Sequence, residues 1–396
     1  MTTPYVQELS RVEVGRSESW TDAKRHYYWL GLIVPVLPLL AAGLVAATGA
    51  GWGWWLGPVV LYVLMPILDV TLGRDHENPP EELVPQLNDD HFYRWCTYAY
   101  LPLQFLSLVV ACAYWAWGDL STIDALGLAA TVGSVGGVAI NTAHELGHKH
   151  PKVEQWLAKV SLAQTGYGHF FVEHNRGHHV HVSTPEDPAS SRLGQSLYSF
   201  LPRTVFGSVR SAVRIERDRR RRAGDRFFSI HNDILNAWAM SVVLFGGLVA
   251  VFGVSVLPWL VLQACIGFLM LEVVNYVEHY GLLRERKENG RYERCRPEHS
   301  WNANNVASNL ALYQLQRHSD HHANPTRRYQ SLRHFDDVPQ LPTGYAGMMV
   351  LALVPPLWRR VMDPRVLAFY GGDVQRANLQ PRRRERLIAR YGSARS

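Results

Sequence analysis

TIDALGLAATVGSVGGVAINTAHELGH, residues 122–148, is the stretch that decides the fold. Residues 122–143 are apolar or small with almost no charge, and a helix of about 20 such residues crosses a bilayer core. The run ends in HELGH, which sets His144 and His148 at positions i and i+4, on one face of a helix. The stretch therefore predicts a membrane-spanning helix that presents two imidazoles at a membrane surface.

Five further charge-poor runs of similar length occur at residues 28–48, 53–73, 98–118, 238–256 and 258–280. Together with residues 122–143 they predict six transmembrane helices. None of the 40 Lys and Arg residues falls within residues 29–73, 95–148 or 227–283, so with six spans all of this positive charge lies on one side of the membrane. The positive-inside rule makes that side cytoplasmic.

Histidine is concentrated in four motifs at or beyond the cytoplasmic ends of these runs. The motifs are HELGHK from His144, EHNRGHH from Glu173, NYVEHYGL from Asn275 and LQRHSDHHA from Leu315. They contain half of the 18 histidines: His144, His148, His174, His178, His179, His279, His318, His321 and His322. Seven others, including His76 and His334, are scattered and are expected to be surface or hydrogen-bonding residues. His169 and His181 flank the second motif and are alternative candidates for supporting the ligands.

The spacing within the motifs indicates metal binding. HxxxH, HxxxHH and HxxHH patterns place imidazoles on a shared helix face, and a helix over residues 315–323 would put all three of its histidines on one face. A single pair is also typical of ordinary hydrogen-bonded polarity. Three such clusters on one side of one membrane instead indicate a common metal site.

This pattern predicts an all-α integral membrane protein, with six transmembrane helices and a large cytoplasmic helical cap holding a histidine-rich dimetal site. The expected organisation is a cytoplasmic N-terminal segment (1–27), transmembrane helices 1–4 (28–143), a cytoplasmic insert with the first two histidine clusters (144–236), transmembrane helices 5–6 (237–282), a cytoplasmic region with the third cluster (283–372) and a basic flexible tail (373–396).

Imidazole ligands suit zinc, copper, iron or nickel, and one tetrahedral zinc needs only three or four of them. Nine are enough for two ions with four or five ligands each and an open position. Two irons fit best, although the spacing leaves zinc and copper open. Nearby acids are expected to accept imidazole N–H groups and to balance the positive charge, or else to cap helices or pair with arginine. These candidates are Glu145, Glu173, Asp187, Glu278 and Asp320.

The four motifs, NYVEHYGL above all, resemble those of the membrane alkane 1-monooxygenase (alkane hydroxylase) family, within the histidine-rich fatty acid desaturase/hydroxylase superfamily. The resemblance extends from the first span to about Gly372. It implies terminal hydroxylation of medium-chain n-alkanes to 1-alkanols, with O2 as co-substrate, at a non-haem di-iron centre that the nine histidines ligate. It also implies a multi-pass protein of the bacterial cytoplasmic (inner) membrane, with the active site on the cytoplasmic side.

The same resemblance implies that the electrons come from rubredoxin, which an NADH-dependent reductase serves. The chain has four cysteines and no CxxC pair, so it cannot supply the two cysteine pairs of a rubredoxin. Rubredoxin is therefore expected as a separate protein or as a domain absent from this chain.

Other functions remain open at this point. The three clusters also fit an aryl-methyl (xylene-type) monooxygenase or a fatty acyl desaturase. HELGH matches the HExxH of zinc metalloproteases with Glu145 as general base, but that reading leaves seven clustered histidines unused. A metal transporter would need ligands along a path through the membrane, and no recognisable nucleic-acid-binding module is present.

Two more features allow two interpretations each. Gly133 and Gly137 form a GxxxG pattern, which is typical of close helix packing but would also leave room for a chain-like substrate. The Arg-rich stretch 214–226 either docks an acidic electron-transfer protein or contacts anionic lipid.

Overall fold

The computed structural model describes residues 20–392, and within that range the chain is helical apart from loops and isolated β-bridges. Six helical stretches are long and apolar enough to cross a membrane: Arg25–Thr48, Gly51–Leu72, His91–Trp117, Thr122–Gly147, Asp233–Phe252 and Val254–His279. The prediction of an all-α protein with six candidate spans is confirmed. Residues 1–19 of the expected N-terminal segment and 393–396 of the expected tail lie outside the described residues.

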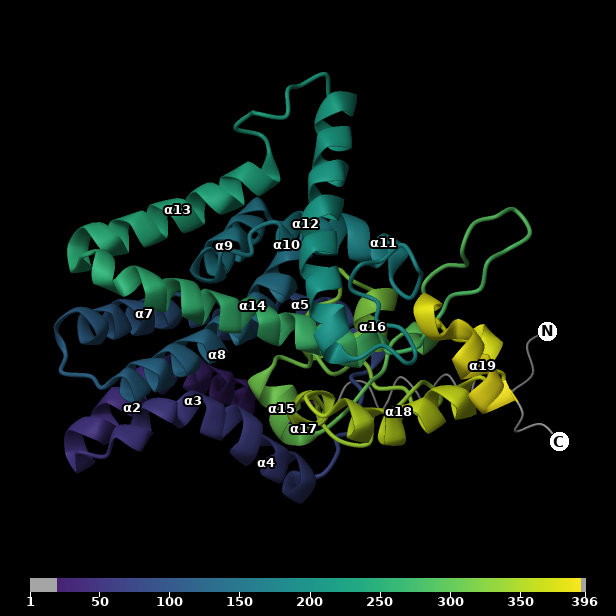
Figure 1. Ribbon diagram of the computed structural model, residues 1–396, viewed down its shortest axis with the longest axis horizontal. Helices are drawn as coiled ribbons and strands as arrows, with labels where there is room; N and C mark the ends of the chain where they lie inside the picture. The colour runs from purple at the N-terminus through teal and green to yellow at the C-terminus, as the bar shows by residue number, and fades with distance from the viewer. Residues whose placement is uncertain (1–19, 393–396) are drawn as a thin grey trace.

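The spans contain α2 (Ile33–Thr48), α3 (Leu56–Val59), α4 (Met65–Leu72), α6 (His91–Tyr98), α7 (Tyr100–Trp117), α8 (Thr122–Gly147), α13 (Asp233–Phe252) and α14 (Leu257–His279). The other helices are α5 (Val84–Asp89), α9 (Lys152–Leu162), α10 (Phe170–Glu173), α11 (His179–His181), α12 (Leu197–Arg222), α15 (Val306–Ala311), α16 (His318–Ala323), α17 (Tyr345–Ala352), α18 (Pro355–Phe369) and α19 (Arg384–Gly392). In Figure 1 the spans form a bundle, and α11, α16, α18 and α19 lie at one end of it.

Helix α8 lies at the centre of this bundle. It begins at Ser121, whose hydroxyl accepts a hydrogen bond from the backbone N–H of Asp124, as helix N-caps commonly do. Residues 131–146 are all buried, as expected for a helix that is apolar around its whole circumference. Its neighbours include α14, α9, α7 and α2. The position of α8 therefore governs where its terminal histidines meet the rest of the site.

The glycines of α8 allow the close approach of α14. A Cβ atom on Gly133 would lie 2.7 Å from the Cβ of Ile266, and one on Gly137 would lie 2.6 Å from the sulfur of Met270. The α14 side chains thus fill the space that the missing side chains leave. The structure supports the helix-packing interpretation of this GxxxG pattern over a substrate channel.

A second apolar core packs the end of α14 against the C-terminal helices. The end of α14 contributes Tyr276 and Tyr280, which pack with Trp358 of α18, and α17 and α19 add further apolar residues. Leu379 and Leu387 are buried in this core, and Leu379 pairs with Leu193 in an isolated bridge. The prediction of a flexible tail is therefore wrong for residues 373–392. The high charge of this segment obscured its few apolar residues, whose spacing lets one side of α19 pack against the core.

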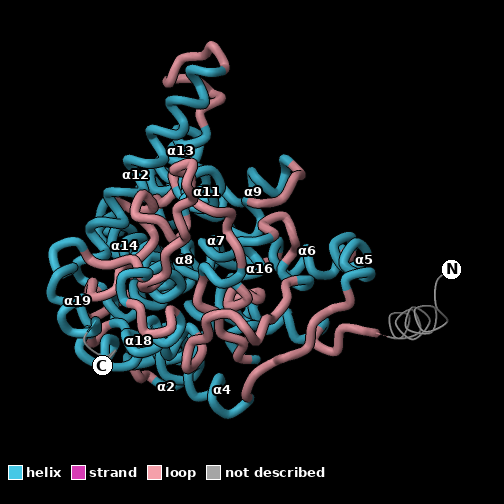
Figure 2. The backbone as a smooth tube through the Cα atoms, turned by 90° about the vertical axis from the view of Figure 1, so that its right-hand side faces the viewer, coloured by secondary structure: helices cyan, strands magenta, loops and turns pink. Residues whose placement is uncertain are grey.

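Helix α12 runs across the spans rather than along them (Figure 1), and its Arg-rich end projects from the body of the molecule (Figure 2). Several of its arginines pair with nearby acids, as Arg219 does with Glu216. In the loop that returns to α13, Phe228 and Ile230 are 85% and 82% exposed. Exposed apolar side chains next to arginines, shortly before a span begins, are typical of contact with a membrane interface.

The packing of α8 on α14 gives a stability test. Replacing Gly133 by leucine should lower the free energy of unfolding by about 1–3 kcal/mol, because the new side chain collides with Ile266 and with the carbonyl oxygen of Gln263. Gly246→Leu is the matched control, because no heavy atom lies within 4 Å of a Cβ there. Thermal unfolding in detergent measures both variants. Equal midpoints would contradict the proposed close contact.

Candidate metal centre

All nine histidines of the four motifs converge, and the structure divides them into two groups. Within each group, one donor nitrogen of every ring lies within 4.8 Å of the others. The five-histidine group consists of His144, His148, His174, His179 and His321. The four-histidine group consists of His178, His279, His318 and His322. The groups adjoin, since the ring centroids of His179 and His322 are 4.5 Å apart.

A wide helical turn separates the histidines of EHNRGHH. Residues His174–His178 form one π turn between α10 and α11, and such turns are frequent at functional sites. The wide turn brings His174 next to His179, with their Nε2 atoms 3.1 Å apart. His178 is left to point into the other group. The spacing of the motif therefore serves both groups at once.

Helix α16 supplies the three histidines of LQRHSDHHA but begins only at His318. Arg317, directly before it, has φ −81° and ψ 43°, which are not helical values, so the helix does not extend back to Leu315. His318 and His322 point into the four-histidine group, where their Nε2 atoms are 2.9 Å apart.

The third histidine of α16, His321, points into the five-histidine group, 3.2 Å from Nε2 of His179. The prediction that the three histidines of α16 share one face is therefore wrong. Neighbouring residues of a helix lie about 100° apart around its axis, so His321 and His322 diverge. Helix α16 consequently lies between the two groups.

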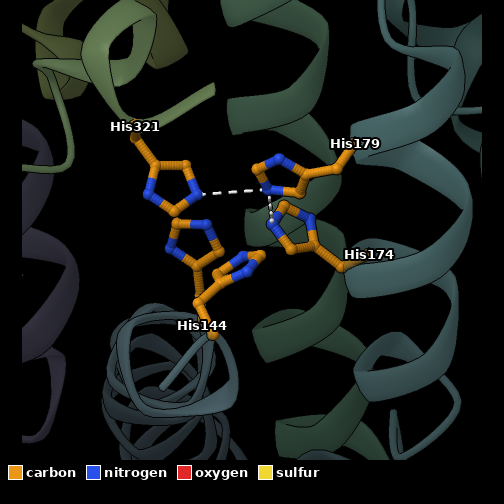
Figure 3. Close-up of side chains that lie close together, drawn as sticks. His144, His174, His179 and His321 are labelled. Atoms are coloured by element: carbon orange, nitrogen blue, oxygen red, sulfur yellow. Dashed lines mark hydrogen bonds between the residues drawn. The ribbon is translucent and has the colours of Figure 1, made fainter. Parts of the chain in front are cut away.

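Figure 3 shows how rings from three parts of the chain meet in the five-histidine group. His144 comes from the end of α8, His174 and His179 come from the wide turn and α11, and His321 comes from α16. The rings of His321, His179 and His174 point toward one another, as the dashed lines between their nitrogens indicate. Residues distant in the sequence thus present their donor atoms to a shared space.

The donor set fits metal ions. Among the described residues, Nε2 of His144, His148 and His178 is buried without a hydrogen-bond partner, as are both ring nitrogens of His279. Leaving a buried polar atom unpaired costs about 1–3 kcal/mol, a penalty that coordination would remove. Burial also lowers the pKa of His174 and His321 well below the usual range. Both rings are therefore neutral, which is the form that binds a metal.

Of the five predicted acids, Asp187 contacts the outer nitrogen of a candidate ligand ring, which is the role expected of these acids. Its Oδ2 lies 2.9 Å from Nδ1 of His178 and also accepts a hydrogen bond from the Ser190 hydroxyl. Burial disfavours this carboxylate, but the contacts with His178 and Ser190 favour it more strongly, and the pKa of Asp187 falls to about 2. The ionised carboxylate holds the His178 ring by Nδ1 and leaves Nε2 free to coordinate.

Glu278 also contacts an imidazole, but at the ring nitrogen that faces another candidate ligand. Its Oε2 lies 3.1 Å from Nε2 of His318, the nitrogen that faces His322, and its Oε1 has no hydrogen-bond partner. This carboxylate therefore lies among the donor atoms of the four-histidine group instead of behind them.

The other three predicted acids form no hydrogen bond or ion pair with an imidazole among the described residues, and Asp320 follows the alternative expectation of pairing with an arginine. Glu145 pairs with Lys149, and Asp320 pairs with Arg333 through Oδ1 at 2.8 Å. Glu173 has one buried oxygen without a partner. The reason is geometric, since a residue one or two positions from a histidine points to another side of the helix. Glu145 and Asp320 instead fasten the segments that carry the histidines.

One buried acid, Glu272, was not among the residues predicted from the sequence. Glu272 lies within span α14 and accepts hydrogen bonds from Tyr167, Thr204 and Asn275. It thereby ties α14 to α12 and to the loop before α10. The position of Glu272 inside an apolar run could have identified it, because an acid in such a run marks a functional or structural site in a membrane protein.

A small cavity of about 20 Å³ adjoins both groups. Its apolar lining consists of Phe170, Leu271, Val274 and Leu315. Its polar lining consists of His144, His174, His318, Glu278 and two asparagines. The arrangement places hydrocarbon side chains directly beside the candidate metal ligands.

Comparison with known proteins gives consistent matches. The family model described as fatty acid desaturase matches residues 122–352. An alkane 1-monooxygenase of Acinetobacter baylyi is 44% identical over 96% of this chain and 94% of its own length. Alkane 1-monooxygenase 1 of Alcanivorax borkumensis is 45% identical over 95% of this chain and 93% of its own. The xylene/toluene monooxygenase hydroxylase component of Pseudomonas putida is 27% identical over 85% of this chain and 87% of its own.

The division into two groups predicts the effect of removing one ligand. His279→Ala should reduce the bound metal to about half of the wild-type amount, because only the four-histidine group loses a donor. The six-span fold should persist, as judged by the elution profile in detergent. Elemental analysis measures the metal, with the exposed His231→Ala as control. Full metal content in His279→Ala would show that His279 is not a ligand.

The contact between Asp187 and His178 predicts a second effect. Asp187→Asn keeps the shape of the side chain but removes its charge, so metal affinity should fall by about 10–100-fold. Glu186→Gln is the matched control, because Glu186 is the exposed neighbour outside the site. Competition with a chelator of known affinity measures the change. An unaltered affinity in Asp187→Asn would mean that His178 needs no such partner.

Proposed function

The chain belongs to the alkane 1-monooxygenase family, and we propose that it hydroxylates medium-chain n-alkanes at a non-haem di-iron centre held by the two histidine groups. It is an oxidoreductase that hydroxylates alkanes at the terminal carbon. The observation that supports the di-iron centre is the convergence of nine imidazoles into adjoining groups of five and four. A single tetrahedral zinc site, as in a metalloprotease, would leave most of these ligands unused.

Glu145 also argues against the metalloprotease. A general base must be able to reach a metal-bound water, but one oxygen of Glu145 pairs with Lys149 and lies 3.3 Å from the backbone nitrogen of Tyr329. The closer similarity to alkane 1-monooxygenases than to the xylene/toluene enzyme favours an alkane over an aryl-methyl substrate.

An alkane has no group on which an acid, a base or a nucleophile can act. Two bound irons would supply the activation of O2, which with two electrons and two protons yields one 1-alkanol and one water. The residues of the chain hold the two ions, orient the rings and position the substrate. Asp187 fixes the His178 ring, and the apolar wall at Phe170, Leu271 and Val274 suits a hydrocarbon chain.

The cavity beside the histidines is too small for the whole substrate. A volume of about 20 Å³ has room for one or two water molecules, so an alkane can enter only when apolar side chains move aside. Leu271 and Val274 lie on α14, one of the six spans, which suggests entry from the side of the bilayer. We infer that the substrate reaches the site from lipid.

The membrane location follows from the same charges that predicted the topology. The protein is a multi-pass membrane protein by its six apolar helices and its relatives. Lys and Arg are absent from the interiors of the predicted spans and are gathered in the segments that join them on one side. We infer that the protein lies in the bacterial cytoplasmic (inner) membrane with the histidine groups at the cytoplasmic face.

We propose that rubredoxin, reduced by its NADH-dependent reductase, delivers the electrons over α11. Val180 and His181 are exposed there, directly after the candidate ligand His179. Arg284 donates a hydrogen bond to the Val180 carbonyl and lines a cleft of about 600 Å³ together with Arg286, Arg296 and Arg376. The cleft also contains Glu285, Glu293 and Glu298, which pair with Arg376 and Arg296. Arg286 is exposed and pairs with none of these acids, so its positive charge can attract an acidic electron donor. The Arg-rich end of α12 lies far from α16 and suits lipid better (Figure 1).

Activity tests the proposal directly. Purified protein with octane, rubredoxin, its reductase and NADH should form 1-octanol, whereas NADH alone should give no turnover because the chain has no cysteine pairs for a rubredoxin centre. Gas chromatography identifies the product, and His279→Ala is the inactive control. Octene as the product would indicate a desaturase. Oxidation of xylene in place of octane would indicate the aryl-methyl activity.

The docking surface predicts a difference between two exposed arginines. Arg286→Glu should raise the rubredoxin concentration needed for half-maximal turnover by about three- to tenfold, because it reverses a charge at the interface. Arg222→Glu at the end of α12 should leave this concentration unchanged. The effect of Arg286→Glu should shrink as added salt screens the charges. The opposite ranking of the two variants would place the donor on α12.

A further inference from the structure

A third cluster of potential metal ligands lies apart from the nine histidines. His76, His334 and Asp336 each present a donor atom, and these atoms all lie within 4.8 Å of one another. Nε2 of His334 is 3.0 Å from Oδ1 of Asp336, and Nδ1 of His76 is 3.7 Å from the same oxygen. The two rings meet edge to face with their centroids 5.1 Å apart.

The backbone holds this cluster in place. Asn78 donates a hydrogen bond from Nδ2 to the carbonyl oxygen of His334 and accepts one at Oδ1 from the His334 N–H. This reciprocal pair fixes the segment that carries His76 against the segment that carries His334. The side chain of His334 is 6% exposed, while those of His76 and Asp336 are 61% and 88% exposed. One ligand is therefore buried and two are open to ions in solution.

Both segments also bind α16, the helix that carries the histidines of the LQRHSDHHA motif. Asp75, next to His76, binds Arg317, which directly precedes His318. Arg333, next to His334, binds Asp320 in the middle of α16. A link between His76 and His334 would therefore brace α16 from both sides.

We propose that His76, His334 and Asp336 form a separate binding site for a divalent cation of the zinc class. Two imidazoles and one carboxylate are a ligand set that zinc accepts, with water in the fourth position. Burial lowers the pKa of His334, so this ring is neutral and able to coordinate. The bound ion joins the loop of residues 74–78 to that of residues 331–336 and so stabilises α16. This site does not depend on the reaction proposed for the nine histidines.

Zinc binding to the metal-loaded, full-length protein tests the proposal. Equilibrium dialysis with radioactive zinc should find one zinc per chain in addition to the metal already bound, with no loss of that metal. His76→Ala and Asp336→Asn should each weaken this binding by at least about tenfold. Both side chains are exposed, so these variants should fold normally. The exposed residues His91 and Asp89 provide the matched controls His91→Ala and Asp89→Asn.

Thermal unfolding gives a second readout. Zinc should raise the unfolding midpoint of the wild type and of both control variants but not that of His76→Ala or Asp336→Asn. Three results would overturn the proposal: the absence of additional zinc, equal zinc binding in His76→Ala and the wild type, or zinc uptake that is matched by release of the metal already bound. The last result would mean that zinc merely replaces metal in the two histidine groups.

Discussion

A neutral imidazole that is buried without a hydrogen-bond partner costs free energy, and the centre of this protein buries several of them together. Metal coordination is the interaction that turns this cost into stability, because each lone pair then finds a cation. Coordination requires the rings to lie close together. The fold accordingly brings nine rings from five helical segments into two adjoining groups. Close packing of α8 on α14 brings His144 at the end of α8 and Glu278 at the end of α14 to the same small cavity. The wide turn at His174–His178 then divides one motif between both spaces.

The acids and arginines around the histidines form a supporting layer. Asp187 holds a ring directly, whereas Glu145 and Asp320 hold the helices that carry rings, through Lys149 and Arg333. Arg317 extends this layer by donating to Asp75 in the loop after the second span. Segments far apart in the sequence are thus tied to α16. The small cavity is lined by apolar side chains as well as by histidines, which brings hydrocarbon and metal ligands together in one place.

The sequence was sufficient for the features that depend on composition and short-range spacing. Apolar runs predicted the six spans, and the four motifs identified all nine histidines of the two adjoining groups. They did not identify His76 and His334, which the structure places together elsewhere. Features that depend on side-chain direction were not predictable in this way. The wide turn and the orientation of α16 decide which ring joins which group. The acids next to histidines were assigned by proximity, but helical geometry turns Glu145 and Asp320 away. Residues 373–392 appeared to be a flexible tail, because their charge concealed the few apolar residues that pack.

The central claim is that the five-histidine and four-histidine groups each hold one iron. Counting metals in the purified wild-type protein tests this most directly, by elemental analysis of iron, zinc and copper against the protein concentration. About two irons per chain with little zinc or copper are expected, since nine nitrogen ligands suffice for two ions with an open position on each. One tightly bound zinc per chain without iron would contradict the claim, and would restore the HELGH motif to the role of a single-metal site.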